Sequence, residues 1–307
     1  MPQYSELFRR NAGILSEEQQ ERLRRARVLI VGCGGIGGTV AVILARSGVG
    51  GFELVDYDTY EASNMNRQIS CTTENLGRKK TDVLREEILR INPEASVRSH
   101  PRLLTHARIA ALMADCNLVF PAADDFAFSL MVFRDAARLG KPALFVVPSG
   151  TWANVSLIFP GGPSVEDIQG IPKLSNYEEY RELFETRKYR YGNYFYVQAA
   201  DWRKEYFKAF MDEDAPVAQL CPWVWIAASL GAAEVVKHLT GLGKPVRPPR
   251  YYRVGKTGVR LERMNGPSFQ TLAAWERRFF YRLFQTPLAP ILEKAQEAWW
   301  RLFFEKP

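Results

Sequence analysis

Short apolar runs alternate with amphipathic segments along the first half of the chain. The apolar runs are rich in Val, Leu, Ile and Phe, which is typical of strands buried on both faces of a sheet. We predict strands at 27–31, 52–56, 95–99, 117–120 and 142–147. We predict helices at 14–26, 36–48, 77–91, 105–114 and 127–139. Strands that alternate with helices indicate an α/β fold with a Rossmann-like, doubly wound and mostly parallel sheet.

The pattern changes after residue 148. "TWANVSLIF" (151–159) alternates like a half-exposed strand, and "RYYRV" with "GVRLERM" predicts a final hairpin, so we expect antiparallel strands at the C-terminal end of the sheet. Between them, 161–220 is long, polar and aromatic, and we assign it as a crossover or substrate segment. An apolar stretch at 223–241 predicts a long helix closed by its glycine. We therefore expect one domain over 1–265.

The last segment, 266–307, has a different composition. It mixes aromatic residues with arginine, as in "WERRFFYRLF" and "AWWRLFFEKP". This pattern predicts an added helical tail of one or two amphipathic helices that pack on the body or on a second subunit. The alternative is an interfacial helix that contacts a membrane surface or another partner, because aromatic and basic residues interleave.

Composition and charge narrow the class of protein. The chain has 307 residues, of which 47% are hydrophobic, so a large core is available. The start, "MPQYSELFRR", lacks the apolar core of a signal peptide, and glycines interrupt the longest apolar run. We therefore expect a cytoplasmic protein. The net charge of +7 favours anionic partners without choosing among nucleotides, acidic proteins, membranes and nucleic acid.

The cysteines and histidines do not form a recognisable metal site. Cys33, Cys71, Cys116 and Cys221 lie far apart with no C-x-x-C pair, which argues against a disulfide framework and against a thiolate zinc site. The histidines are scattered as well. A lone histidine such as His106 is more often a surface residue, or hydrogen-bonded within the protein, than a metal ligand. No zinc is expected.

A glycine-rich loop follows the first predicted strand. "VLIVGCGGIGG" places Gly32, Gly34, Gly35 and Gly37 between a strand and a helix, where the backbone can approach a phosphate and the helix N-terminus supplies free N–H groups. Asp56 ends the next strand, where a ribose-binding acid sits in dinucleotide folds. This context predicts an adenine nucleotide, and NAD and ATP both remain open.

The stretch "SNMNRQ" (63–68) separates these two nucleotides. Cleavage of ATP between its α- and β-phosphates develops charge that cations and amide donors stabilise, and Asn64, Arg67 and Gln68 supply such groups. Lys80 lies on the following helix within reach of the same pocket. A nicotinamide enzyme would have no task for this cluster. We therefore favour ATP.

Two aspartates are candidates to hold a magnesium ion. Asp124 follows the strand "NLVF" at the carboxyl edge of the sheet, where open α/β sheets bind ligands. Its carboxylate is an oxygen ligand of the kind that Mg²⁺ prefers, and Asp58 is a candidate to assist it.

The order of these motifs resembles the ThiF/MoeB/HesA family, the bacterial relatives of ubiquitin-activating enzymes. The resemblance rests on "RN-x-G", "EEQ-x-x-L", "VLIVGCGGIGG", "LVDYD", "SN-x-NRQ", "LG-x-x-K" and "INP", which occur in this order from residue 9 to residue 93. It continues more loosely through "AADD", "GKPALF" and "AASLGAAEVVKHLTGLGKP". Several spaced motifs in order are specific for the superfamily and say little about the substrate.

The resemblance implies an adenylation domain over 1–265 that binds ATP and Mg²⁺. The glycine loop would bind the nucleotide, Asp56 the ribose, Asn64, Arg67 and Lys80 the phosphates, and Asp124 the Mg²⁺. Members are usually homodimers that lend an N-terminal arginine across the interface. The "RN" motif assigns this role to Arg10, with Arg9 as the alternative. The implied reaction is adenylation of a carboxylate, commonly the C-terminal glycine of a ubiquitin-like or sulfur-carrier protein, with release of pyrophosphate.

The sequence departs from the family pattern at three points. It lacks the two C-x-x-C zinc pairs, and "PAADD" keeps Asp124 while losing an aspartate and an asparagine of the family motif. The segment 161–220 contains no cysteine. Cys221 follows it directly and is the one candidate for a thioester nucleophile. We expect adenylation without a covalent cysteine step, with the acceptor a small carrier protein, a peptide or a small acid.

Three other functions remain as alternatives. A relative of the tRNA threonylcarbamoyladenosine dehydratase would fit the positive charge, although no pattern of basic and aromatic residues specifies RNA. An NAD-dependent oxidoreductase is disfavoured by "SNMNRQ", Lys80 and Asp124. A non-catalytic scaffold that binds a partner through the aromatic tail is disfavoured by the complete set of phosphate-binding candidates.

Overall fold

The computed structural model describes residues 2–185, 201–211, 215–267 and 269–304. In these residues eight strands form one sheet in the order β3-β2-β1-β4-β5-β6-β7-β8. The parallel strands are β1 (Arg27–Val31), β2 (Gly51–Val55), β3 (Ser96–His100), β4 (Leu118–Pro121) and β5 (Ala143–Ser149). The antiparallel strands are β6 (Trp152–Ile158), β7 (Arg250–Gly255) and β8 (Gly258–Arg263). The predicted parallel sheet with C-terminal antiparallel strands is confirmed.

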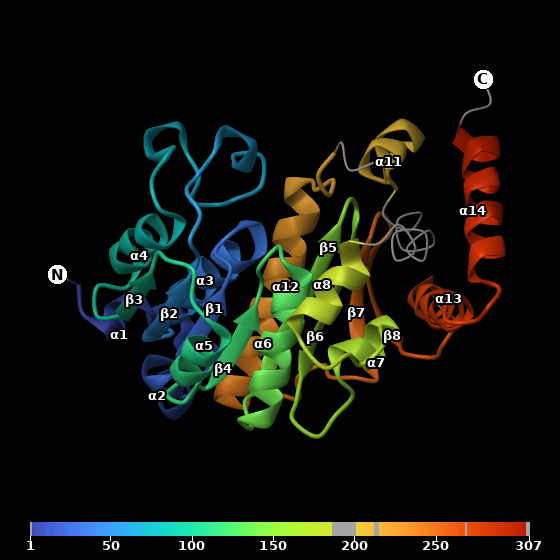
Figure 1. Ribbon diagram of the computed structural model, residues 1–307. Helices are drawn as coiled ribbons and strands as arrows, with labels where there is room; N and C mark the ends of the chain where they lie inside the picture. The colour runs from blue at the N-terminus through green and yellow to red at the C-terminus, as the bar shows by residue number, and fades with distance from the viewer. Residues whose placement is uncertain (1, 186–200, 212–214, 268, 305–307) are drawn as a thin grey trace.

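Helices cover both faces of the sheet (Figure 1). One apolar core joins the sheet to α2 (Glu17–Arg25), α3 (Gly35–Ser47), α4 (Lys80–Ile91) and α12 (Cys221–Thr240). A second core joins the other face to α5 (His106–Met113), α6 (Phe126–Arg138), α7 (Val165–Gln169) and α8 (Tyr177–Glu185). No helix among the described residues is long and apolar enough to cross a bilayer.

The helix boundaries follow local sequence signals. Ser16 caps α2 by accepting a hydrogen bond from the N–H of Gln19 at 3.2 Å. Gly48 and Gly241 end α3 and α12 in the left-handed conformation, as their positions predict. The prediction was too early for α4, which begins at Lys80 rather than at residue 77, because Gly77 has φ +79° and Lys79 is the N-cap.

The prediction of a half-exposed strand at 151–159 was wrong. Every residue of β6 is buried. Ala153, Val155 and Leu157 pack in the core with α12, and Ile158 packs in the other core with α7. The alternation of polar and apolar residues in β6 therefore does not indicate a face exposed to solvent, because α12 and α7 cover the two faces of the strand.

The remaining elements lie at the two ends of the molecule. The chain starts with α1 (Tyr4–Leu7) and the 3-10 helix η1 (Arg9–Gly13), and short 3-10 helices η2 (Ala62–Asn64) and η3 (Thr73–Asn75) follow β2. The segment 161–220 contains α7, α8 and α11 (Lys204–Met211), and its residues 186–200 and 212–214 lie outside the described residues. The tail forms α13 (Phe269–Phe284) and α14 (Ala289–Phe304) at the side opposite the N-terminus (Figure 1).

Candidate active site

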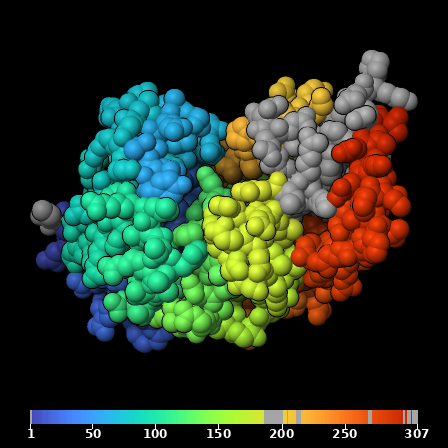
Figure 2. Space-filling model, in the orientation of Figure 1, coloured from blue at the N-terminus to red at the C-terminus, as the bar shows by residue number. Residues whose placement is uncertain are grey.

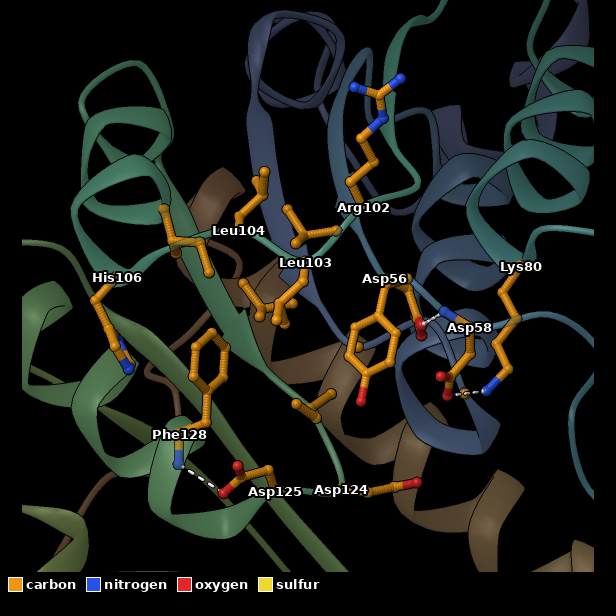
Figure 3. Close-up of a pocket in the computed structure, with 18 of the residues that line it drawn as sticks. Asp56, Asp58, Lys80, Arg102, Leu103, Leu104, His106, Asp124, Asp125 and Phe128 are labelled. Carbon is orange, nitrogen blue, oxygen red and sulfur yellow. Dashed lines mark hydrogen bonds and ion pairs between the residues drawn. The ribbon is translucent and has the colours of Figure 1, made fainter. Parts of the chain in front are cut away.

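A cavity of about 510 Å³ opens at the carboxyl ends of β1, β2 and β4. The strand order places β1 beside both β2 and β4, with the chain winding in opposite directions from this point, which is where doubly wound sheets bind ligands. Figure 3 shows Asp56, Asp58 and Lys80 together on one side of the cavity and Leu104, His106 and Phe128 on the other. Six of the candidate residues line it, namely Gly32, Gly34, Asp56, Asp58, Lys80 and Asp124.

The glycine loop is packed too closely for side chains. Gly32 has φ +100°, and a Cβ there would lie 2.5 Å from the backbone of Ala122 and Ala123. A Cβ on Gly37 would lie 1.8 Å from the carbonyl oxygen of Gly32. Gly34 is the N-cap of α3 and has no side chain to occupy the first N–H groups of the helix. These groups are therefore available to an anion at the cavity.

Asp56 holds this loop in place. Its Oδ2 accepts a hydrogen bond from the N–H of Cys33 at 2.7 Å, and its Oδ1 accepts one from the N–H of Asp58 at 2.9 Å. The Cys33 side chain is fully buried, and burial raises the pKa of its thiol. Cys33 is therefore a packing residue, and Asp56 positions the loop while facing the cavity.

Lys80 brings a buried cation to the polar end of the cavity. It is 5% exposed, and its Nζ lies 2.8 Å from Oδ2 of Asp58 (Figure 3). Burial lowers the pKa of Lys80, but the hydrogen bond that its ammonium group donates to Asp58 and the negative charges of Asp56, Asp58 and Asp124 outweigh burial, so the pKa is raised overall. The amine is therefore protonated at neutral pH and faces a space lined by carboxylates.

Asp124 lies across the cavity from this pair. It follows β4, and the surrounding protein partly desolvates it, which raises the pKa of its carboxyl group. The negative charges of Asp56 and Asp58 raise the pKa further, while Lys80 and Arg67 lower it. A carboxylate in such surroundings gains from a nearby cation, which is the property required of a magnesium ligand.

The 63–68 loop borders the glycine loop rather than lining the cavity. Carbon atoms of Arg67 lie 3.4 Å from the Cβ position of Gly35, and Nε2 of Gln68 lies 3.6 Å from that of Gly34. Nε of Arg67 and Oε1 of Gln68 are buried and have no hydrogen-bond partner among the described residues. Buried polar atoms without partners are uncommon. Nε of Arg67 is a donor that an anion could satisfy, whereas Oε1 of Gln68 is an acceptor and needs a donor.

The side chain of Asn64 forms hydrogen bonds within its own turn. It is 9% exposed, its Oδ1 accepts a hydrogen bond from the N–H of Glu61 at 3.2 Å, and its Nδ2 lies 3.4 Å from Oγ of Ser63. Its carbonyl oxygen accepts from the N–H groups of Arg67 and Gln68 at 3.1 and 2.9 Å. Asn64 therefore shapes the loop that carries the other two candidates.

The start of α12 fixes this loop from the other side. Nε1 of Trp225 donates to the carbonyl oxygen of Arg67 at 2.9 Å, and Nδ2 of Asn66 donates to that of Gln219 at 3.1 Å. Val224 packs 3.3 Å from the Cβ position of Gly35. The sequence analysis did not assign Trp225 a role, because its contact spans a long stretch of chain and no local pattern marks it.

The apolar end of the cavity was also not predicted. It is lined by Leu103, Leu104, Ile109, Phe128, His106 and Tyr177. His106 packs against Phe128 with ring centroids 4.4 Å apart, and burial lowers the pKa of His106. The hydroxyl of Tyr177 on α8 donates to Oδ2 of Asp125 at 2.8 Å, which raises the pKa of Tyr177 to about 12. The crossover segment therefore reaches the cavity wall beside Asp124.

Residues 103–106 come shortly after β3, so the position after a parallel strand, which located Asp56 and Asp124, could also have identified them. Each residue after a parallel strand lies at the same edge of the sheet. Tyr177 carried no such signal, since it comes from the irregular segment after the sheet's parallel part.

Three other candidate residues lie away from the cavity lining. Arg9 and Arg10 are exposed in η1, where the neighbouring Asn11 donates to the carbonyl oxygen of Ser47 at the far end of α3. Cys221 is partly exposed as the first residue of α12. None of them lines the cavity within this chain.

The fold and the cavity define a doubly wound α/β protein with a glycine-rich loop between β1 and α3, an aspartate directly after β2 and a buried lysine at the start of α4. The model of the ThiF family matches residues 8–272. The chain therefore belongs to the ThiF family. This confirms the family resemblance seen in the sequence.

Two curated relatives illustrate the match. The sulfur carrier protein adenylyltransferase of Thermus thermophilus is 38% identical over 128 residues, which cover 42% of this chain and 47% of the relative. The molybdopterin-synthase adenylyltransferase of Escherichia coli is 30% identical over 226 residues, covering 74% and 78% of the two chains. The match to the first of these relatives spans about half of its length.

Solved structures show the same fold. The E. coli protein MccB, crystallised with ATP, aligns with a TM-score of 0.62 at 24% identity over 80% of this chain and 65% of MccB. The protein PaaA aligns with a TM-score of 0.59 at 22% identity over 80% of this chain and 66% of PaaA.

Proposed function

We propose that this protein is an ATP-dependent adenylyltransferase that activates a carboxylate as an acyl-adenylate and releases pyrophosphate. The observation that carries the proposal is the convergence of a glycine loop, Asp56, Lys80 and Asp124 on one cavity, with the 63–68 loop beside it. Membership of a family whose curated relatives are named adenylyltransferases supports it.

The cavity suggests how the nucleotide lies. The flat base takes the apolar end between Leu103, Ile109 and Phe128, and the ribose hydroxyls face Asp56. The phosphates then extend along the glycine loop toward Lys80, where N–H groups of α3 and the ammonium group meet their charge.

The reaction needs charge stabilisation more than proton transfer. A carboxylate oxygen of the acceptor attacks the α-phosphorus, a bond to the bridging oxygen breaks, and pyrophosphate leaves with that electron pair. The acceptor is already an anion at neutral pH, so no general base is required. Lys80 and Arg67 stabilise the charge that develops on the phosphates, and Gln68 offers an amide beside them.

Asp124 is the proposed ligand for Mg²⁺. The described residues contain no cluster of three potential ligands that would make a protein-only metal site. Mg²⁺ instead commonly uses one or two carboxylates together with substrate phosphates and water, and Asp124 with Asp58 fits this requirement. When bound, the ion would neutralise charge on the phosphates.

We further propose a homodimer in which Arg10 serves the cavity of the partner subunit, with Arg9 as the alternative. Both arginines are exposed, and the neighbouring Asn11 is hydrogen-bonded to Ser47 at the C-terminal end of α3. Neither arginine lines the cavity of the same chain. A cation at this position therefore reaches a phosphate only in another copy of the chain.

The acceptor is proposed to be the C-terminal carboxylate of a small carrier protein or a peptide. A glycine terminus is favoured because it lacks a side chain that would collide with the closely packed glycine loop. Adenylation itself leaves no task for Cys221, whose place at the start of α12 is outside the cavity lining.

The test is exchange of radiolabelled pyrophosphate into ATP with candidate acceptors that end in Gly-Gly. We expect acceptor-dependent exchange that is lost in Lys80→Met. Arg78→Gln is the matched control, because Arg78 is a nearby cation that pairs with Glu86 on the surface at 2.6 Å. ATP binding without exchange for any acceptor would favour the scaffold, and exchange that requires tRNA would favour the dehydratase-like alternative.

A further inference from the structure

Helix α13 is attached to the body by one of its faces. Ala273 and Ala274 are 1% and 7% exposed, and Nη1 of Arg277 donates to both the carbonyl oxygen and Oε1 of Gln169 at 2.8 and 2.9 Å. The close approach is possible because Gly170 has no side chain, since a Cβ there would lie 2.3 Å from the carbonyl oxygen of Ala274. This face is buried against the end of α7 and holds the helix in a fixed orientation.

The opposite face of α13 is apolar and open to solvent. Leu272, Trp275 and Phe279 follow one another at helical spacing and are 49%, 63% and 44% exposed. The rings of Trp275 and Phe279 stack with centroids 5.3 Å apart and planes inclined by 11°. Burying these large rings in an apolar environment would lower the free energy far more than their contact with each other does, so their exposure requires an explanation.

Arginine side chains border this apolar face. Arg278 and Arg282 line, with Trp275 and Phe279, a shallow groove of about 540 Å³. Arg278 donates one hydrogen bond to the carbonyl oxygen of Asp167 at 2.8 Å and remains exposed. The acid of this helix, Glu276, is on the buried side at 5% exposure. The exposed face is therefore aromatic and positively charged.

Exposed aliphatic side chains continue beyond α13, where α14 carries charges of both signs in Glu293, Lys294 and Glu297. Leu288, Ile291 and Leu302 are 52%, 66% and 58% exposed along the following turn and α14. In Figure 1, α14 stands at the edge of the molecule, and in Figure 2 the tail forms the margin opposite the N-terminal half. The apolar residues are thus spread over two helices rather than gathered in one groove. We call Leu272, Trp275, Arg278, Phe279, Arg282, Leu288, Ile291 and Leu302 the tail surface.

We propose that the tail surface binds the headgroup region of an anionic lipid bilayer. The apolar and aromatic side chains would enter the boundary between headgroups and acyl chains, and the arginines would contact lipid phosphates. An anionic bilayer fits Arg278 and Arg282 because the only acid of α13, Glu276, lies on its buried side, so no exposed carboxylate of this helix opposes the lipid phosphates. The spread of exposed apolar residues over α13, α14 and their connection exceeds the single groove that a docked peptide helix would cover.

This attachment leaves the candidate active site open. The cavity lies at the carboxyl ends of β1, β2 and β4, with α8 contributing Tyr177 to its wall, whereas α13 and α14 lie at the edge of the molecule beyond α7 (Figure 1). The protein would therefore carry out its reaction at a membrane surface. Either the acceptor or the enzyme that uses the product would then be associated with the same membrane. The proposal does not depend on which carboxylate is activated.

The experiment is flotation of the full chain with phosphatidylcholine vesicles that do or do not contain phosphatidylglycerol. We expect binding only with the anionic lipid and a loss of binding as salt rises. The double variant Trp275→Ala/Phe279→Ala should bind at least about tenfold more weakly, since it removes two large apolar groups from the interface. Arg282→Gln should weaken binding and reduce its salt dependence.

Two controls keep the result interpretable. Leu261→Ala removes a residue on β8 that is 53% exposed and lies outside the tail surface, so binding should not change. Trp275→Phe should keep binding but lose part of the tryptophan quenching by brominated lipid. Equal flotation of all variants, or no flotation of the wild type, would overturn the proposal. Self-association that the double variant abolishes, without vesicle binding, would assign the tail surface to a second copy instead.

Discussion

Asp56 allows a test of how the glycine loop is held. The variant Asp56→Asn keeps the size of the side chain but replaces one acceptor oxygen with an NH₂ donor. In the wild type the two carboxylate oxygens of Asp56 accept hydrogen bonds from the N–H of Cys33 at 2.7 Å and from the N–H of Asp58 at 2.9 Å. In the variant, one of these N–H groups would face the NH₂ group of asparagine, which is also a donor. A hydrogen bond to a charged group contributes about 1.5–3 kcal/mol. We expect the free energy of unfolding to fall by this amount.

The matched variant is Asp58→Asn, two residues away. It makes the same change of charge, but only one oxygen of Asp58 accepts from a side chain, the buried Nζ of Lys80, and asparagine keeps an oxygen that can accept there. We therefore expect a smaller loss of stability than for Asp56→Asn. Thermal unfolding of the two variants gives the comparison. At about 2–4 °C per kcal/mol, Asp56→Asn should melt about 3–12 °C below the wild type, and Asp58→Asn much closer to it. Equal melting temperatures of the two variants would show that Asp56 does not hold the loop.

Three further predictions concern the surroundings of the phosphates. Because the pKa of Asp124 is raised, its ionised form destabilises the folded state above the ordinary value of 3.8, but the side chain is exposed and solvent screens most of this effect. Asp124→Asn should therefore raise the melting temperature only slightly at neutral pH, lose this gain in acid, and abolish pyrophosphate exchange. Trp225→Phe removes the hydrogen bond to the carbonyl oxygen of Arg67, and exchange kinetics should show kcat/KM reduced by about two- to tenfold with an unchanged melting temperature. Cys221→Ala should leave exchange unchanged, and mass spectrometry should find no thiol-sensitive adduct between the wild type and its acceptor; a stable thioester at Cys221 would contradict this.

Local sequence signals predicted most of the sheet and one end of the cavity. The strands that lead to Gly32, Asp56 and Asp124 are short, apolar and buried on both faces, and each is followed within three residues by one of these cavity-lining residues at the same edge. In a parallel sheet this repetition is enough to bring residues far apart in sequence to one place. The same reasoning placed Lys80 near them, on the helix after β2.

Features that depend on packing between distant segments were not predictable in this way. The burial of β6 results from α12 on one face and α7 on the other, and neither is visible in the alternation of residues 151–159. Tyr177 reaches the cavity only because α8 packs beside α6. The side chain of Asn64 closes its own turn, which a count of polar donors does not reveal.

The most direct test of the proposed function follows a heavy-oxygen label from the acceptor carboxylate. An acceptor that supports pyrophosphate exchange is labelled at its terminal carboxylate and incubated with ATP, and the adenylate is then released with hydroxylamine. Attack of the carboxylate on the α-phosphorus predicts one heavy oxygen in the AMP and pyrophosphate without label. Label in inorganic phosphate, with ADP as the nucleotide product, would contradict adenylation and indicate an acyl-phosphate reaction instead.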